Sequence, residues 1–242
     1  MNVVGSAAMR SVLAVVAHPD DESFGLGGVL GRLAGDGVRV RVLCFTRGEA
    51  STLGDDVDLA VIRPRELACA AEQLAAQEVV LLDYPDGGLA GVPANELERV
   101  VDDHIGDADA VVVFEPGGVT AHPDHQAATA AAEQVAARRH LRAVEWGIPH
   151  EIAAALNAEF GTTFVGVEGD DLEVDRAVQW RAIACHRSQY HDNPVLNRRL
   201  ELQGRHERIR VRATGDLTVR TRAPHGTFAS TPWGMTGGSV MP

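Results

Sequence analysis

The sequence predicts a single α/β domain in which helices cover both faces of a mainly parallel sheet. Short runs rich in β-branched residues alternate along the chain with alanine-rich stretches of helical character. Such alternation is typical of parallel strands joined by right-handed helical crossovers. The chain has 242 residues, of which 45% are hydrophobic, so it can bury one large core without disulfides. We expect the domain at residues 1–223 and an irregular tail, rich in Gly, Thr, Ser and Pro, at residues 224–242.

Six segments are expected to form strands. The first, residues 11–17, is the apolar run SVLAVVA, which is typical of a strand buried on both faces. The second, residues 38–45, alternates in polarity as VRVRVLCF. The remaining strands are expected at residues 79–82, 108–114, 143–148 and 163–167.

Six further segments have helical character. The helix expected at residues 26–34 is ended by Gly35 and Gly37. A long alanine-rich helix is expected at residues 123–139, after the fourth strand. The other helices are expected at residues 63–76, 94–105, 175–186 and 194–203.

The composition disfavours several classes of protein. The net charge of −12 argues against nucleic acid and anionic membranes as partners. All 22 basic residues are arginine, which excludes a P-loop lysine and a Schiff-base lysine. No apolar run approaches the ~20 residues of a membrane span, and the first run is too short for a signal peptide. The three cysteines, Cys44, Cys69 and Cys185, form no CxxC pair, so we expect buried free thiols in a reducing compartment and a cytoplasmic protein.

Two copies of the sequence His-Pro-Asp lie where the first and fourth strands are expected to end. One is AHPDDE at residues 17–22, and the other is AHPDH at residues 121–125. Ligands of an open parallel sheet bind beside the carboxyl ends of its strands, near the point where the strand order reverses. Either copy alone could be a solvated turn. Two copies at two strand ends favour a functional site, because a turn does not require so much charge.

The residue types in these motifs match a catalytic zinc site, which has three protein ligands and a fourth position for water. We expect His18 and Asp21 to bind the ion from the first motif and His125 to bind it from the second. Asp20 is left beside the metal as the general base that takes the proton of the water. The set predicts metal-assisted hydrolysis of an acyl group, with zinc or another divalent ion such as iron.

His122 lies one helical turn before His125, on the same face of the helix. We expect it to contact either the developing oxyanion or the leaving nitrogen, with the carboxylate of Asp124 accepting a hydrogen bond from its imidazole. Other histidines lie in charged or irregular stretches and are expected at the surface: His104, His140, His150, His191, His206 and His225.

The stretch AVVAHPDDESFGLGG, together with the later AHPDH, resembles the PIG-L/LmbE-like family of zinc de-N-acetylases. The stretches FTRGEAS, RPREL, LDYPDGGL and ACHRSQ are also similar to that family, so the resemblance covers most of residues 11–210. It implies a Rossmann-like fold and removal of an N-acetyl group, usually from an amino sugar. It also implies zinc on the same three ligands, Asp20 as the general base, and His122 partnered by Asp124.

The resemblance also suggests contacts to the substrate. Arg63 and Glu66 match an R-x-x-E segment of the family in which the arginine often contacts substrate; alternatively, Arg63 is a surface residue at a helix start. Glu22 and Glu49 are expected to bind substrate or to support the site, unless they are ordinary polar residues in turns. Asp86 lies in the turn sequence Pro-Asp-Gly and is expected to be only a turn residue.

The sequence limits the substrate without naming it. Members of the family that act on mycothiol-type substrates tend to carry a tyrosine where this chain has Thr120. We expect a small, soluble N-acetylated amino sugar. The alternatives are an amidase for a larger amide, such as a thiol–sugar conjugate, and a non-catalytic Rossmann-type binding module, for which the GxGxxG turn is missing. A homo-oligomer is compatible with the sequence.

Overall fold

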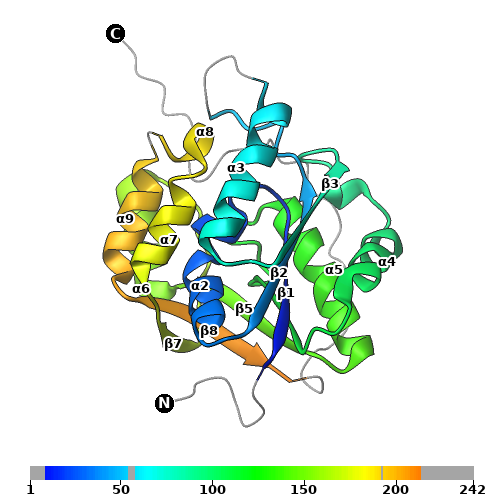
Figure 1. Cartoon of the computed structure of the whole chain (residues 1–242). Coiled ribbons are helices and arrows are strands. Elements are labelled where there is room, and N and C mark those ends of the chain that lie inside the picture. The colour runs from blue at the N-terminus through cyan, green and yellow to red at the C-terminus, as the bar shows by residue number, and fades with distance from the viewer. Residues whose placement is uncertain (1–8, 54–57, 192, 214–242) are drawn as a thin grey trace.

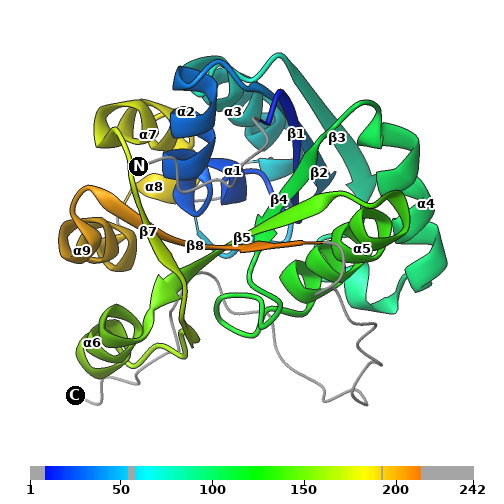
Figure 2. The ribbon, with the colours of Figure 1, turned by 90° about the horizontal axis from the view of Figure 1, so that it is seen from below.

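One sheet runs through the part of the chain that the computed structural model describes, residues 9–53, 58–191 and 193–213. Its strands are β1 (Ser11–Val16), β2 (Arg39–Thr46), β3 (Glu78–Tyr84), β4 (Ala110–Phe114), β5 (Arg142–Pro149), β6 (Gly166–Val167), β7 (Asp170–Glu173) and β8 (His206–Arg212). The strand order is β3-β2-β1-β4-β5-β8-β7, with β6 beside β5. Figure 1 labels most of these strands, and Figure 2 adds β4 between β1 and β5. The strands β1 to β5 pair in parallel, whereas β8 is antiparallel to β5 and β7. The expectation of a mainly parallel sheet is confirmed.

Helices cover both faces of the sheet, as the alternation of elements predicts. On one face lie α4 (Ala94–Ile105) and α5 (Pro123–Arg139); on the other lie α2 (Gly27–Gly35), α3 (Leu59–Gln73) and α7 (Arg176–Ile183) (Figure 2). The remaining helices are α1 (Asp21–Phe24), α6 (His150–Phe160), α8 (Arg187–Tyr190), α9 (Pro194–Gln203) and the short 3-10 helix η1 (Leu89–Gly91).

The central strand β1 contributes to the core on both faces, because successive side chains of a strand point to opposite sides. Val12, Ala14 and Val16 pack beneath α2 and α3, whereas Leu13 and Val15 pack beneath α4 and α5. Each of the five is at most 2% exposed. The continuous apolar run is thus explained by the place of β1 in the middle of the sheet.

Several elements in the C-terminal part are not expected from the sequence. The strand β8 reads as a charged segment, HERIRVR, yet Glu207 points inward and accepts a hydrogen bond from Trp146 Nε1 at 2.7 Å. Glu207 also pairs with Arg176. A buried carboxylate is stable only with such partners, which come from distant parts of the chain. The strand expected at residues 163–167 is shorter in the structure, where it forms β6. The elements α6, α8 and β7 were not expected from the sequence, and neither was α1 near the N-terminus.

Two helix boundaries differ from the predicted ones in ways that affect the site. The helix expected at residues 63–76 begins earlier, at Leu59, so Arg63 lies inside it. The helix expected at residues 175–186 ends at Ile183, where short backbone hydrogen bonds, such as His186 N to Ile183 O at 3.0 Å, turn the chain. The stretch after Ile183 therefore leaves α7 and runs toward the first motif.

The prediction of free thiols is wrong for two of the three cysteines. Cys69 of α3 and Cys185, after α7, form a disulfide with a Cα–Cα distance of 5.8 Å, whereas Cys44 is free and buried. The two partners are 116 residues apart, and only the packing of α3 beside α7 brings them together. The argument for a reducing compartment loses this support, and the cytoplasmic location stays a prediction.

Two further expectations concern the C-terminal end of the domain and the absence of a membrane span. The expected domain end at residue 223 and the tail at residues 224–242 lie outside the described residues. Within the described ranges, no helix has the length and apolar character that crossing a membrane requires.

Candidate metal-dependent active site

The two His-Pro-Asp motifs lie on either side of the point where the strand order reverses. From β1 the chain proceeds outward to β2 and β3, and then returns to β4 on the other side of β1. The loop after β1 carries the first motif, and the loop after β4 carries the second. Adjacent parallel strands end at the same edge of the sheet, so the two motifs face each other there.

The first motif folds into a buried turn that its own carboxylates hold. Asp21 Oδ2 accepts hydrogen bonds from the backbone amides of Ala17 at 3.2 Å and His18 at 2.9 Å. The amide of Asp20 donates to Glu22 Oε2 at 3.0 Å. Asp20 has a φ of 127°, which is unfavourable for a residue with a side chain. Such a backbone persists only where surrounding contacts fix it, which is common at functional sites.

Glu115 shapes the loop that carries the second motif. This buried carboxylate accepts hydrogen bonds from the amides of Gly117 at 2.5 Å and Val119 at 2.6 Å. The resulting turn places the carbonyl oxygen of Gly118 at 3.2 Å from Nδ1 of His125. The ring of His125 is thereby oriented with its Nε2 atom toward the first motif.

The three residues expected to bind zinc converge. Nδ1 of His18 lies 3.3 Å from Nε2 of His125, and the two oxygens of Asp21 lie 3.6 Å and 3.1 Å from these nitrogens. Ligands of a tetrahedral zinc ion with bonds of ~2.0–2.2 Å lie about 3.3–3.5 Å apart. Asp21 Oδ1 is buried and receives no hydrogen bond from the described residues. The spacing and the chemistry of these donors therefore fit a divalent metal ion.

Each metal-site histidine has a second partner that orients its ring. Nε2 of His18 lies 2.9 Å from Asp86 Oδ1, and Nδ1 of His125 faces the carbonyl of Gly118. Such outer partners fix the tautomer of a metal-binding histidine and raise its basicity. Asp86 is therefore part of the site, and the expectation that it is only a turn residue is wrong. The Pro-Asp-Gly pattern explains the turn after β3, but not where the carboxylate of that turn points.

Asp86 is in turn held by the loop that follows β2. Its Oδ2 atom accepts a hydrogen bond from the amide of Ala50 at 2.9 Å, and its own amide donates to Glu49 Oε1 at 2.9 Å. Burial raises the pKa of the Asp86 carboxyl, but the contact with His18 outweighs this and lowers it. Glu49 is exposed, so this residue lies at the rim of the site.

The surroundings of His18 are strongly negative. Burial lowers the pKa of its imidazole, but hydrogen bonds with the carboxylates of Asp124, Asp21 and Asp86 outweigh this and hold the pKa well above its ordinary value. Three carboxylates around one buried ring favour a cation, either a proton or a metal ion. A metal ion would have to displace the proton from His18.

Asp20, the expected general base, is held by Arg63. Arg63 Nη2 lies 3.0 Å from Asp20 Oδ2, and the same guanidinium donates to the carbonyl oxygens of Pro19 and of Gly48. Burial raises the pKa of Asp20 to about 7, although the charge of Arg63 opposes the rise. A carboxyl group with a pKa near neutrality is suited to accept and release a proton.

Arg63 differs from one of the two expectations for it. It is 3% exposed and lies inside α3, so the alternative of a surface residue at a helix start is wrong. Its partners are the turn of the first motif and Gly48, whose φ of 67° and lack of a Cβ leave room for the guanidinium. Arg63 thus supports the turn of the first motif, and a contact with substrate stays a prediction.

Glu22 is completely buried and faces Ser23 and His186. Its Oε1 atom accepts hydrogen bonds from Ser23 Oγ and His186 Nε2, both at 2.6 Å. This geometry favours a role for Glu22 in holding the turn over direct binding of substrate. His186 was not expected to take part in the site, and the sequence signal for it is the stretch ACHRSQ, which also resembles the family.

His122 lies at the start of α5 and faces both metal-site histidines. Its ring centroid is 5.0 Å from that of His18 and 4.8 Å from that of His125. Its Nδ1 atom accepts a hydrogen bond from the amide of Asp124 at 3.2 Å. Burial, together with the two other histidines, lowers the pKa of His122 to about 4. His122 is therefore a neutral ring at neutral pH.

The carboxylate of Asp124 makes contacts that differ from the expected ones. It accepts hydrogen bonds from the amides of Gly87 at 2.8 Å and Leu89 at 3.0 Å, and it lies 3.4 Å from His18 Nε2. Among the described residues these partners do not include the imidazole of His122, which Asp124 contacts through its amide instead. Asp124 thus ties the second motif to the turn after β3.

The sequence is similar to a protein-family model and to known proteins. The family model PIG-L, GlcNAc-PI de-N-acetylase, matches residues 13–136, which is more than half of the chain. A 1D-myo-inositol 2-acetamido-2-deoxy-alpha-D-glucopyranoside deacetylase of Acidothermus cellulolyticus is 31% identical over an alignment of 199 residues. This alignment covers 67% of this chain and 68% of that protein. The protein of the same name from Kineococcus radiotolerans is 31% identical, and the match spans 60% of this chain but only half the length of that relative.

The fold has a counterpart among solved structures. The N,N'-diacetylchitobiose deacetylase from Pyrococcus horikoshii has a TM-score of 0.63 to this chain, with 22% identity over 87% of this chain and 86% of that one. This similarity confirms the α/β fold. The matched family model contains both strand-end loops that build the site. The chain belongs to the PIG-L family of de-N-acetylases.

Proposed function

We propose that the chain is a zinc-dependent hydrolase that removes the N-acetyl group from a small N-acetylated amino sugar. The observation that carries this proposal is the convergence of His18, Asp21 and His125 beside Asp20, a carboxylate that is held separately by Arg63. Membership of a de-N-acetylase family supports the reaction. The names of the two relatives, both deacetylases of an acetamido sugar linked to inositol, support the substrate class.

The donor set assigns distinct roles to the residues of the site. His18, Asp21 and His125 would hold the zinc ion. A bound zinc ion would act as a Lewis acid and lower the pKa of a water molecule beside it. Asp20 would accept the proton of that water as it attacks the amide carbonyl, and would return the proton to the leaving amine.

The position of His122 supports a role in binding the oxyanion. Because its Nδ1 atom accepts a hydrogen bond from the amide of Asp124, the ring proton of the neutral imidazole is on Nε2. An Nε2–H group can donate a hydrogen bond to the oxygen that becomes negative as the carbonyl is attacked. Of the two roles left open by the sequence, the oxyanion role is therefore the one that we propose.

Glu49 is the expected substrate contact that the geometry supports best. It lies at the exposed rim, and one carboxylate oxygen is used to hold the amide of Asp86. The other oxygen could accept a hydrogen bond from a sugar hydroxyl. Glu22 and Arg63 would instead support the turn that carries Asp20.

The test is the release of free amine from a panel of N-acetylated amino sugars by the zinc-loaded protein. We expect activity to disappear on chelation and to return with zinc. Asp20→Asn should lower kcat by roughly 10²- to 10⁴-fold while zinc content is unchanged. Asp36→Asn, a change at an exposed aspartate after α2, is the matched control. Full activity of Asp20→Asn would exclude this carboxylate as the base, and larger amides cleaved in preference to acetyl groups would indicate the amidase alternative.

A further inference from the structure

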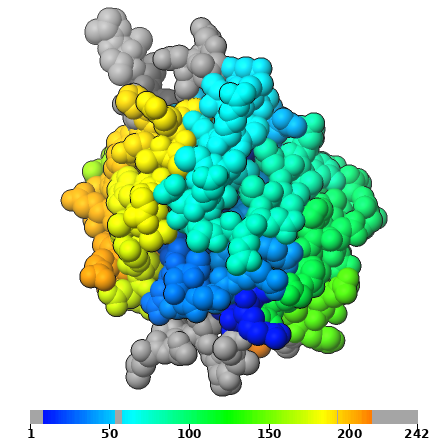
Figure 3. Space-filling view, in the orientation of Figure 1, coloured from blue at the N-terminus to red at the C-terminus, as the bar shows by residue number. Residues whose placement is uncertain are grey.

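Helix α3 is fastened to the segment Cys185–Gln189 at two points. The disulfide joins Cys69 of α3 to Cys185, and Glu66 of α3 accepts hydrogen bonds from the amide and the hydroxyl of Ser188 at 2.8 Å and 2.6 Å. Figure 3 shows α3 in cyan against the yellow segment that contains α7 and α8. Neither contact touches the metal ligands.

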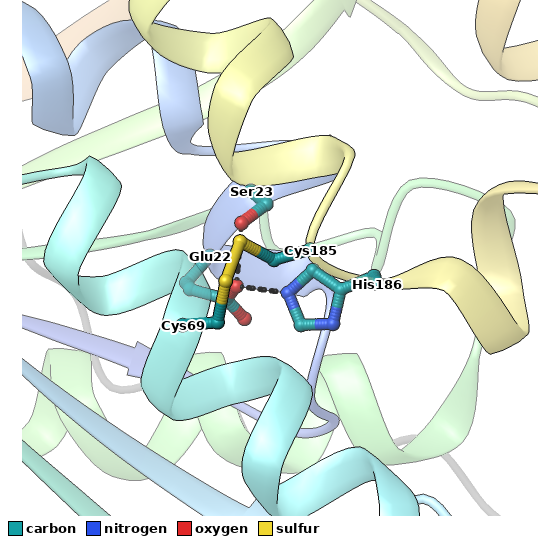
Figure 4. Close-up of a disulfide and its surroundings, with 5 residues drawn as sticks. All are labelled: Glu22, Ser23, Cys69, Cys185 and His186. Carbon is teal, nitrogen blue, oxygen red and sulfur yellow. Dashed lines mark hydrogen bonds and ion pairs between the residues drawn. A yellow bond between two sulfur atoms is a disulfide. The ribbon is translucent and has the colours of Figure 1, made fainter.

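Between these two fastening points, His186 points inward to Glu22. Figure 4 shows the imidazole beside the disulfide, with its Nε2 atom bonded to the Glu22 carboxylate. Both side chains are completely buried, and the Nε2–Oε1 distance is 2.6 Å. Nδ1 of His186 has no hydrogen-bond partner among the described residues, so its bond to Glu22 is the polar contact that orients the ring.

Glu22 transmits this contact to the expected base. Its second oxygen, Oε2, accepts the hydrogen bond from the amide of Asp20 at 3.0 Å. Asp20 has the unfavourable φ of 127°, which requires outside contacts to persist. Its amide is held through Glu22 by His186, and its carboxylate is held by Arg63 of α3. The contact to the Asp20 amide thus depends on His186, which follows Cys185. The contact to its carboxylate depends on Arg63, which lies in the same helix as Cys69.

The disulfide can be reached from solvent. Cys69 is exposed, and Cys185 is half-buried. The adjacent His186 is completely buried, so the chain passes within one residue from an accessible bond to the interior. An exposed disulfide is open to attack by a thiol, whereas a buried one is not.

We propose that His186 is a positioning residue for Asp20, and that the Cys69–Cys185 disulfide fastens it, so that the reaction depends on the oxidation state of this bond. The inference rests on the proposed function, because it takes Asp20 as the base. Opening the disulfide frees the segment before His186, loosens the His186–Glu22 contact, and lets the turn at Asp20 relax from its strained backbone.

The redox step requires a dithiol reductant, which supplies two electrons and two protons. Its thiolate attacks Sγ of Cys69, the sulfur–sulfur bond breaks, and Cys185 leaves as a thiolate that takes up a proton. The second thiol of the reductant then attacks the mixed disulfide, releases Cys69 as a thiol, and closes into a cyclic disulfide.

The experiment measures the zinc-loaded full chain before and after treatment with a dithiol. Hydrogen exchange at the amides of residues 20–24 and 186–190 reports how well the turn and the segment after the disulfide are protected. Zinc content, kcat and KM are measured in parallel. The variants are Cys69→Ser, which removes the disulfide at an exposed position, and His186→Gln. Their matched controls are Ala68→Ser, at the neighbouring exposed position of α3, and His191→Gln, at an exposed histidine.

We expect reduction to raise exchange in both segments and to lower kcat roughly 10- to 100-fold, with KM within about twofold and zinc retained, because a small displacement of a catalytic group is costly. Cys69→Ser should behave like the reduced protein and no longer respond to the dithiol. His186→Gln should show the same loss of kcat, and the two controls should match the oxidised wild type.

Two results would overturn the inference. One is unchanged exchange at residues 20–24 after reduction and in Cys69→Ser; the other is raised exchange without any loss of kcat in an active enzyme. If the oxidised wild type releases no amine from any substrate, the proposed function fails. The exchange data then still decide whether the disulfide and His186 hold the turn, so the two failures are distinguishable.

Discussion

Replacing Arg63 by leucine removes the guanidinium that pairs with the buried carboxylate of Asp20. The guanidinium is 3% exposed and lies 3.0 Å from Asp20 Oδ2, and it also satisfies the carbonyl oxygens of Pro19 and Gly48. Removing one partner of a buried ion pair typically costs about 3–5 kcal/mol, because the other charge is left uncompensated. For a chain of this length, we expect Tm to fall by roughly 6–20 °C.

A double variant separates the cost of the unpaired charge from the cost of lost packing. In Arg63→Leu, neutralising the stranded charge with Asp20→Asn should recover at least about 1 kcal/mol, whereas Asp20→Asn alone should be destabilising. Arg65→Leu, an exposed position two residues further along α3, is the matched control and should change stability by less than about 0.5 kcal/mol.

The assay is urea unfolding at pH 9, above the pKa of about 7 of Asp20, so that the carboxylate is charged in the wild type; unfolding is followed by tryptophan fluorescence and circular dichroism. Coincident transitions would show that the free energies of unfolding can be compared between variants. A loss of less than 1 kcal/mol in Arg63→Leu, or a double variant no more stable than the single one, would refute the view that Arg63 stabilises the charge of Asp20.

Three further predictions concern the surroundings of the site. Asp86→Ala should weaken zinc binding by roughly 10- to 100-fold, because His18 loses the carboxylate that orients it; a competition titration with a chelator measures this, and Asp83→Ala, at an exposed aspartate of β3, is the control. Glu115→Ala should destabilise the chain by about 1–3 kcal/mol in urea unfolding, since two backbone amides lose their acceptor. Asn193→Ala should cost about 1 kcal/mol in the same assay, because the side chain of Asn193 caps α9 through the amide of Leu196 at 2.9 Å. Zinc affinity unchanged in Asp86→Ala, or stability unchanged in either of the other two variants, would contradict the role assigned.

The sequence by itself determined the features that depend on local pattern. The alternation of apolar strands and alanine-rich helices is a local property, so it predicted the parallel sheet and the helices on both faces. The clustering of His18, Asp21 and His125 was also predictable, because these residues lie in two short motifs at strand ends, and strand ends of a parallel sheet meet at one edge.

Only the tertiary structure decided which distant residues support those motifs. Asp86, His186 and the partners of the disulfide come from turns and helix ends whose local sequences already have a structural explanation. The direction of a side chain after such a turn depends on how neighbouring helices and loops pack, and no local pattern encodes it. The same limit applies to Arg63: its sequence position suggested a helix start, whereas the packing of α3 places it behind Asp20. Local patterns therefore identified the three side chains that cluster, and long-range packing supplied the residues that hold them and Asp20 in position.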